Sequence, residues 1–133
     1  MKVAVAVICN QDNQVLITQR PLHASHGGYW EFPGGKLEDN ESATDALCRE
    51  ITEEVGITIL ETQFLCEIYH QYDTKHVTLL VYLCNQFKGN ATARESQMDL
   101  RWVAINELNK YQFPEANNII IQHINETLGQ NAS

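Results

Sequence analysis

Residues 3–9, Val-Ala-Val-Ala-Val-Ile-Cys, form an apolar run with no polar residue inside it. A strand with one buried face alternates apolar and polar residues, whereas a continuous apolar run is typical of a strand covered on both faces. Such a strand needs a packed layer on each side of its sheet. We therefore expect an α/β fold, a mixed β-sheet sandwiched between helices (α/β/α), and the 133 residues suit one domain, residues 1–133.

The rest of the chain supplies the strands and helices that such a fold requires. Turn-forming residues at positions 10–13 predict a hairpin, and Pro33-Gly34-Gly35 should end a short extended piece. Ser42 and Asn106 are candidate helix caps, and Gly56 suits the left-handed residue that ends a helix. The expected helices are residues 42–54, 106–110 and 117–128. The expected strands after the first are residues 15–19, 30–32, 63–72, 76–87 and 100–104, with a turn at 73–75.

Net charge, the length of apolar segments and the cysteine spacing limit which partners and which cellular compartment we expect for this chain. Asp and Glu number 17 against 9 Lys and Arg, which gives a formal charge of −8 and argues against nucleic-acid polymers as partners. No segment approaches the roughly 20 apolar residues of a membrane span, so we expect no membrane partner. The cysteines form no C-x-x-C pair and are expected to be free thiols in a reducing cytoplasm; they are Cys9, Cys48, Cys66 and Cys84.

The first expected helix carries glutamates in an unusual direction. On a helical wheel at about 100° per residue, Ala43, Leu47 and Ile51 define the core-facing stripe. Glu50 and Glu54 fall within roughly 20° of Ala43, so both carboxylates point along the apolar face. A solvated acidic face is the ordinary interpretation of a run of charges, but it does not account for this shared direction.

Carboxylates in that direction need a counter-charge. Partly buried and unpaired, they would cost several kcal/mol or take up protons. Arg49 is a nearby cation, but one arginine cannot neutralise all of these glutamates. Mg²⁺ can, with Mn²⁺ as a substitute, because carboxylate oxygens are hard ligands and such ions also bind phosphate oxygens. Lys36, directly after Gly34-Gly35, can reach a phosphate as a point charge.

Residues 35–57 resemble the signature of a known family. The pattern G-x5-E-x7-R-E-U-x-E-E-x-G-U, in which U is a bulky aliphatic residue, is filled by Gly35, Glu41, Arg49, Glu50, Ile51, Glu53, Glu54, Gly56 and Ile57. This resembles the Nudix box, with every defining position filled, and the signal is highly specific. The resemblance implies the Nudix fold and metal-dependent hydrolysis of a nucleoside diphosphate linked to another moiety.

The same resemblance implies roles for individual residues. The implied metal-binding and catalytic set is Glu50, Glu53, Glu54 and Glu95, joined at the metal by the backbone carbonyl of Gly34. Glu95 is our candidate for the glutamate that a later loop often adds, and a solvated loop charge is its alternative interpretation. The implied structural residues of the box are Gly35, Glu41, Arg49 and Gly56, with Glu41 and Arg49 paired.

Matches outside the box resemble the MutT branch of the family, which removes oxidised guanine nucleotides. They are Ile17-Thr-x-Arg20, Glu31-Phe-Pro-Gly-Gly-Lys36, His76-x-Thr-Leu79, Glu95-x-Gln97 and Phe113-Pro-x-Ala-Asn117. In that branch the asparagine matching Asn117 reads the oxidised purine edge, since an amide offers a donor and an acceptor in one plane. The expected substrate-binding set is Arg20, Phe32, Gly34, Gly35, Lys36, Lys75 and Asn117. Lys75 stands where the branch has an arginine, and lysine stacks on a base less well than a planar guanidinium.

We therefore expect a cytoplasmic, monomeric enzyme whose substrate is a nucleoside triphosphate. It would hydrolyse 8-oxo-dGTP to 8-oxo-dGMP and pyrophosphate, sanitising the nucleotide pool for DNA replication and repair. Water would attack the β phosphorus, with Glu50 as the favoured base and Glu95 as the second choice. The alternatives are a CTP or 5-methyl-dCTP pyrophosphohydrolase, a broad enzyme for sugar nucleotides or dinucleotides, and a non-catalytic nucleotide-binding module.

Overall fold

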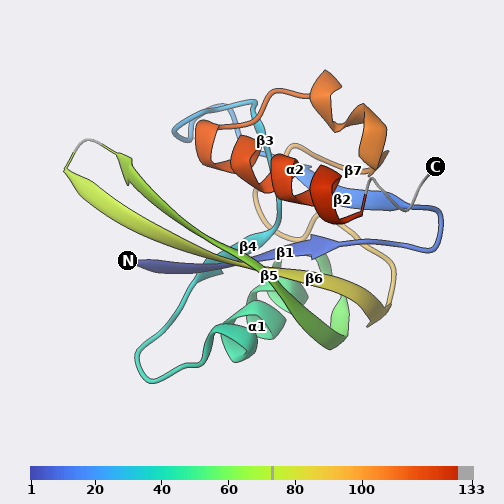
Figure 1. The fold of residues 1–133 in the computed structure, drawn as a ribbon, viewed down its shortest axis with the longest axis horizontal. Helices are drawn as coiled ribbons and strands as arrows, with labels where there is room; N and C mark the ends of the chain where they lie inside the picture. The colour runs from blue at the N-terminus through green and yellow to red at the C-terminus, as the bar shows by residue number, and fades with distance from the viewer. Residues whose placement is uncertain (73, 129–133) are drawn as a thin grey trace.

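The computed structural model describes residues 1–72 and 74–128, and its strands form two sheets (Figure 1). The 4-stranded sheet runs in the order β4 (Gly34–Lys36), β1 (Lys2–Ile8), β6 (Lys75–Lys88) and β5 (Thr58–Tyr72). The 3-stranded sheet runs in the order β3 (Trp30–Glu31), β2 (Gln14–Gln19) and β7 (Asp99–Ala104). The helices are α1 (Ala43–Val55), the 3₁₀ helix η1 (Ile105–Lys110) and α2 (Glu115–Thr127).

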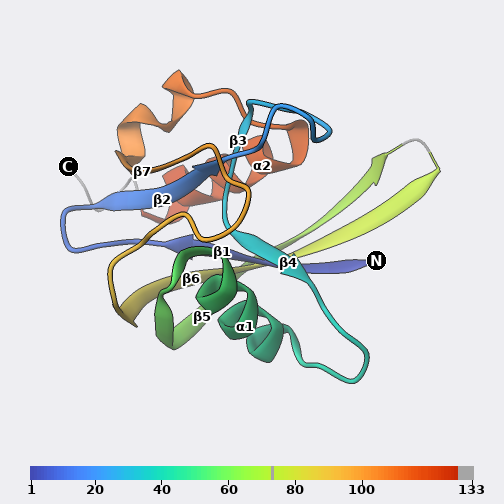
Figure 2. The same ribbon diagram turned by 180° about the vertical axis from the view of Figure 1, so that it is seen from behind.

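Strand β1 is covered on both faces, as its apolar run predicts. Ala4, Ala6 and Ile8 pack in the core cluster that contains the apolar stripe of α1. Val5 and Val7 pack in the other cluster, which contains the buried residues of α2. The two views show α1 and α2 on opposite sides of the larger sheet (Figures 1 and 2). Because β1 pairs parallel to β6 and antiparallel to β4, that sheet is mixed, and the predicted α/β/α arrangement is confirmed.

Strand β2 does not return along β1 as the predicted hairpin required. A single bridge between Cys9 and Val15 joins the two strands, and β2 then pairs with β3 and β7 in the smaller sheet. The turn itself forms, since Oδ1 of Asn10 accepts the amides of Asp12 and Gln14, both at 3.0 Å. Local turn chemistry reverses the chain, but tertiary packing decides which sheet the next strand joins.

Other predicted boundaries also differ. Gly34–Lys36 is strand β4 and not only a turn, because β1 supplies pairing partners that local propensity does not reveal. Asn106 does not cap η1, which begins at Ile105 without a side-chain cap. Helix α2 begins at Glu115, before the predicted residue 117, and β5 begins at Thr58, before the predicted residue 63, because pairing with β6 extends it. Asp73, in the predicted turn at 73–75, lies outside the described residues.

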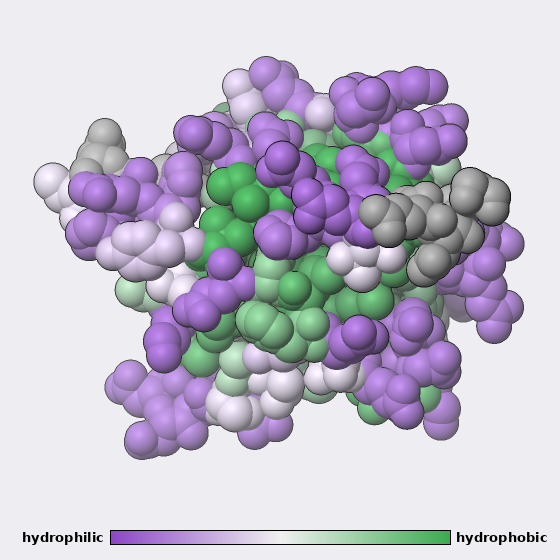
Figure 3. Space-filling view, viewed as in Figure 1, coloured by the Kyte–Doolittle hydropathy of each residue, from purple (hydrophilic) through white to green (hydrophobic). Residues whose placement is uncertain are grey.

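The surface offers a projecting hairpin and no membrane-spanning helix. Strands β5 and β6 extend well beyond the body of the molecule, and Lys75 begins the second of them (Figures 1 and 2). On the face seen in Figure 3, hydrophobic side chains gather across the middle and hydrophilic ones surround them. Within the described residues, no helix is long and apolar enough to cross a bilayer. The free thiols predicted from the sequence are confirmed for Cys9, Cys48, Cys66 and Cys84.

Candidate active site

Helix α1 carries the predicted carboxylates, and its ends form as expected. Ser42 Oγ accepts the backbone amide of Asp45 at 3.1 Å, which caps the first turn. Gly56 follows the helix in the left-handed conformation, with a φ of 73°. Leu47 and Ile51 are fully buried against the larger sheet. This apolar stripe sets the rotation of the helix and therefore the direction of its carboxylates.

Glu54 is partly buried beside β4. Its Oε2 accepts the backbone N–H of Gly34 at 2.9 Å. The pKa of Glu54 is raised from 4.5 to about 8, first by burial and then by the nearby carboxylates of Glu31, Glu50 and Glu95, against the lowering effect of the Gly34 bond. A carboxyl group in this environment favours either a bound proton or a cation beside it.

The glycines of β4 allow its backbone to approach other groups closely. A Cβ atom at Gly35 would overlap the carboxylate of Glu50, and one at Gly34 would overlap the carbonyl oxygen of Ala4 in β1. Any side chain at either position would therefore displace a neighbour. The two glycines therefore let strand β4 lie directly against β1 and against the Glu50 carboxylate.

Arg49 is shared among several carboxylates. Its Nε and Nη2 donate to Glu41 at 2.8 and 3.0 Å, and its Nη1 donates to Glu50 at 2.9 Å. Glu53 and Glu38 lie further away, at 3.5 and 3.7 Å from Nη1. The hydrogen bond from Arg49 is the main cause that lowers the pKa of Glu41 to about 2. The pairing of Glu41 with Arg49 that the family resemblance implied is therefore present.

The structure brings some of the predicted metal-binding residues together and not others. Glu54 and Glu95 line a common cavity of about 260 Å³. Glu50 lies against Gly35 and accepts a hydrogen bond from Arg49, and it does not line that cavity. Glu53 is turned outward, with 55% of its side chain exposed. Among residues 1–72 and 74–128, no group of three or more Asp, Glu, His or Cys side chains is gathered closely enough to hold a metal ion as it stands.

The chemistry of these carboxylates nevertheless fits a divalent cation. Burial and the mutual repulsion of four carboxylates raise the pKa of Glu54, and a cation would relieve both effects. All the available donors are oxygen atoms, which hard divalent ions prefer.

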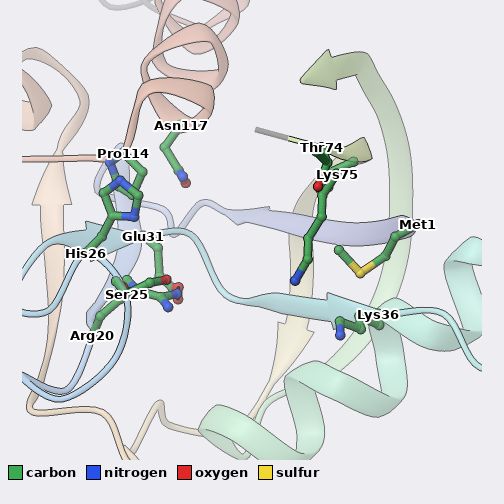
Figure 4. A pocket seen from close by; sticks show the side chains of 11 residues that line it. Met1, Arg20, Ser25, His26, Glu31, Lys36, Thr74, Lys75, Pro114 and Asn117 are labelled. Carbon is green, nitrogen blue, oxygen red and sulfur yellow. Dashed lines mark hydrogen bonds and ion pairs between the residues drawn. The ribbon is translucent and has the colours of Figure 1, made fainter. Parts of the chain in front are cut away.

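A larger cavity of about 760 Å³ opens beside this cluster (Figure 4). Arg20 and Asn117 line one side of it, and Lys36 and Lys75 line the other (Figure 4). These four residues come from distant parts of the sequence, and all were predicted to bind substrate. Their cations give an acidic protein a local surface suited to an anionic ligand.

Asn117 lies in the first turn of α2, close to the main chain of Phe32. Its Oδ1 accepts the Phe32 N–H at 3.4 Å. The Phe32 side chain is buried, and its ring stacks on Phe113 with 5.3 Å between centroids. Phe32 therefore packs in the core with its ring, while its backbone N–H bonds Asn117, which lines the cavity. The helix cap position is held by Pro114, so Asn117 is not the cap of α2.

Glu31 is a site residue to which sequence reasoning assigned no role. Nη1 of Arg20 donates to both of its carboxylate oxygens, at 2.8 and 3.0 Å, and Nε of Arg20 donates to the carbonyl of Ser25 at 2.8 Å. Arg20 and Glu31 line both cavities, so their ion pair stands at the boundary between them. The sequence feature that could have pointed to Glu31 is strand alternation, which turns its side chain away from the buried side chains of Trp30 and Phe32.

Known proteins resemble this chain along most of its length. A family model described as "NUDIX domain" matches residues 4–123. A Proteus vulgaris protein named 8-oxo-dGTP diphosphatase is 43% identical over 95 residues, which cover 71% of this chain and 85% of that protein. An Escherichia coli (strain K12) protein named CTP pyrophosphohydrolase is 33% identical over 112 residues, which cover 84% of this chain and 82% of that protein.

Solved structures agree with the sequence matches. The crystal structure of a MutT NUDIX hydrolase from Burkholderia pseudomallei superimposes with a TM-score of 0.85 at 30% identity, covering 92% of this chain and 96% of that chain. Nudix hydrolases generally use divalent metal ions, which agrees with the carboxylates gathered near α1. The complete box, the fold and these matches show that the chain belongs to the Nudix hydrolase family and resembles the MutT branch of that family.

Proposed function

We propose that this chain is a Mg²⁺-dependent diphosphatase that hydrolyses 8-oxo-dGTP to 8-oxo-dGMP and pyrophosphate. The observation that carries the proposal is the Asn117 amide at the edge of a nucleotide-sized cavity, which adjoins the cavity of Glu54 and Glu95. The name of the Proteus vulgaris relative supports the same substrate. Such an activity would sanitise the nucleotide pool for DNA replication and repair, in a cytoplasmic and monomeric enzyme.

Recognition of the base rests on Asn117 and the main chain of Phe32. Their mutual hydrogen bond is long, at 3.4 Å, so a ligand can replace it at little cost. The oxidised purine carries an N–H donor at N7 where guanine has an acceptor, and the amide oxygen of Asn117 can accept it. Guanine would instead direct a lone pair at that oxygen, which disfavours dGTP.

Glu50, Glu53, Glu54 and Glu95 are the side chains that would hold Mg²⁺, with the carbonyl of Gly34 as a further ligand. When bound, the ion would polarise the phosphoryl group and lower the pKa of the attacking water. Glu54 must give up its proton to act as a ligand, so its raised pKa makes ion binding dependent on pH. Lys36 and Arg20 would neutralise phosphate oxygens along the path between the two cavities.

In the chemical step, the oxygen of water bonds to the β phosphorus while the bond from that phosphorus to the α–β bridging oxygen breaks. A carboxylate takes the proton of the water. Glu95 is better placed for this than Glu50, because Oε1 of Glu50 already accepts Nη1 of Arg49 at 2.9 Å. Glu95 forms no ion pair among the described residues and lines the same cavity as Glu54. We therefore place Glu95 ahead of Glu50 as the proton acceptor.

The test is turnover of 8-oxo-dGTP and of dGTP under the same Mg²⁺ concentration. We expect a higher kcat/KM for the oxidised nucleotide, and equal values would contradict the sanitising function. Hydrolysis in ¹⁸O-labelled water should place the label in pyrophosphate and leave 8-oxo-dGMP unlabelled. The opposite distribution would mean attack at the α phosphorus.

A cytidine nucleotide is the second candidate substrate, because one relative is named CTP pyrophosphohydrolase. CTP, 5-methyl-dCTP, a sugar nucleotide and a dinucleotide belong in the same panel. A pyrimidine has no N7–H group for Asn117, so we expect weaker turnover. A higher kcat/KM on CTP than on 8-oxo-dGTP would favour this candidate.

A non-catalytic module would turn over none of these nucleotides. Unchanged turnover by Glu53→Gln would contradict the metal-binding role of Glu53.

A further inference from the structure

The irregular segment between β6 and β7 carries Glu95, and it is fastened to the C-terminal end of α1. The last four carbonyl groups of a helix lack partners inside the helix and must be satisfied from elsewhere. Here the amide of Thr92 donates to the carbonyl of Val55 at 2.9 Å, and the amide of Arg94 donates to the carbonyl of Glu54 at 3.0 Å. The segment therefore approaches the backbone of the same residue whose carboxylate shares a cavity with Glu95.

Gln97 adds a second link at this point. Its Nε2 donates to the carbonyl of Glu54 at 3.0 Å, and its Oε1 accepts the amide of Glu95 at 2.9 Å. A single side-chain amide thus connects the backbones of Glu54 and Glu95. Within residues 92–98, Gln97 is half-buried and every other residue is exposed, so its side chain is the one directed into the protein.

We propose that Gln97 is the positioning residue that holds Glu95 at the reacting end of the site, opposite Glu54. The inference rests on the proposed function, in which the Glu95 carboxylate acts on the attacking water or on the bound cation. Glu95 is exposed and lies outside any helix or strand, so regular structure does not restrict its backbone. The Arg94 amide fastens the residue before Glu95, and the Gln97 side-chain amide restricts Glu95 itself, because it can bond Glu95 and Glu54 together only when the two backbones lie close to each other.

Gln97→Met is the test variant, since it keeps the length of the side chain and removes both hydrogen bonds. We expect kcat for 8-oxo-dGTP with Mg²⁺ to fall by roughly 10- to 100-fold, because small displacements of a catalytic group have effects of this size. KM should stay within about twofold, since Gln97 does not line the larger cavity. Gln63→Met is the matched control, because Gln63 is an exposed glutamine on β5.

A double-variant cycle separates positioning from a general structural role. If Gln97 acts through Glu95, Gln97→Met should change kcat by less than about twofold once Glu95→Gln is present. Multiplicative losses in the double variant, or an unchanged kcat in Gln97→Met alone, would overturn the inference. Should Gln97→Met fail to fold, Gln97→Glu serves in the same cycle, because it keeps the acceptor for the Glu95 amide and loses the donor to Glu54.

A structural measurement distinguishes failure of this inference from failure of the proposed function. Amide hydrogen exchange at Glu95, followed by NMR, needs no substrate. We expect faster exchange of the Glu95 amide in Gln97→Met than in the wild type and in Gln63→Met. If the wild type turns over none of the nucleotides, the proposed function fails, while unaltered exchange at Glu95 would refute the positioning role whatever the substrate is.

Discussion

The backbone N–H of Gly34 donates to Oε2 of Glu54 at 2.9 Å, which joins strand β4 directly to the last carboxylate of helix α1. This bond crosses from a glycine directly before the Nudix box to a glutamate of the box twenty residues later. It holds a partly buried carboxyl group in place, yet it does not overcome the burial that raises the pKa of that group. The surroundings of Glu54 therefore favour either a proton on its carboxyl group or a cation beside it.

The raised pKa of Glu54 predicts a specific pH dependence of stability for protein kept in chelator. Below about pH 4.5 the group is protonated in both the folded and unfolded states. As pH rises from 4.5 towards about 8, the unfolded chain releases the proton while the folded protein retains it, so the free energy of unfolding falls. Above about pH 8 this fall in the free energy of unfolding is complete. The difference between the folded and unfolded pKa values of Glu54 limits the fall to a few kcal/mol, on the order of 1.4 kcal/mol for each pKa unit.

Urea unfolding at several pH values checks this prediction. Glu54→Gln stays neutral throughout, so its free energy of unfolding should decline less between pH 5 and about 8 than that of the wild type. Glu61→Gln, a change at an exposed glutamate of β5, is the control and should follow the wild type. Parallel curves for Glu54→Gln and the wild type would contradict the prediction.

Addition of Mg²⁺ should raise Tm at pH 8, because an ion that binds only the folded state stabilises it by mass action. At an ion concentration about 100 times the dissociation constant, the gain is about 2.7 kcal/mol. The rise in Tm should be smaller in Glu54→Gln and unchanged in Glu61→Gln. Differential scanning fluorimetry with and without Mg²⁺ measures the rise in Tm of each protein. An equal rise in the wild type, Glu54→Gln and Glu61→Gln would argue against a site at Glu54.

The pair formed by Glu41 and Arg49 predicts the opposite pH dependence. The hydrogen bond from Arg49 lowers the pKa of Glu41 from 4.5 to about 2, so the stability it contributes is present above pH 4.5 and is lost as pH falls towards 2. Glu41→Gln should be less stable than the wild type at pH 7, and the difference should shrink below pH 4. Glu38→Gln is the control, since Glu38 lies 3.7 Å from Arg49 and its side chain is 71% exposed. Chemical denaturation over this pH range measures the difference in the free energy of unfolding between Glu41→Gln and the wild type. A difference that stays constant with pH would refute the prediction.

Asn117 predicts the discrimination between oxidised and ordinary purines. Asn117→Ala removes the oxygen that would accept the N7–H of the oxidised purine, whereas Asn117→Asp keeps an acceptor there and loses only the amide donor. The ratio of kcat/KM for 8-oxo-dGTP to that for dGTP should fall by roughly 10- to 100-fold in Asn117→Ala, corresponding to about 1–3 kcal/mol for a polar contact, and should be retained in Asn117→Asp. Asn118→Ala, on the exposed side of the same helix, should leave the ratio unchanged. A preserved ratio in Asn117→Ala would move base recognition elsewhere in the cavity.

Much of the fold and of the box was readable from local patterns. The apolar run at β1 required cover on both faces, and the wheel of α1 placed Glu50 and Glu54 towards the sheet. Ser42 and Gly56 marked the ends of that helix correctly. These features depend on residues within a few turns or one strand of each other, where side-chain type and spacing govern the backbone.

Tertiary structure decided what the local patterns could not. The reversal after β1 sends β2 into the smaller sheet, and Gly34–Lys36 becomes a strand because β1 lies beside it. The partners of Glu31 and Gln97 are likewise visible only in three dimensions, since Arg20 and Glu54 lie far from them along the chain. By itself the sequence determined the kind of chemistry, through carboxylates placed on an apolar face. Only packing decided which carboxylate is paired, which is buried and which is held by a neighbouring loop, because burial and hydrogen bonding arise between segments that are distant in sequence.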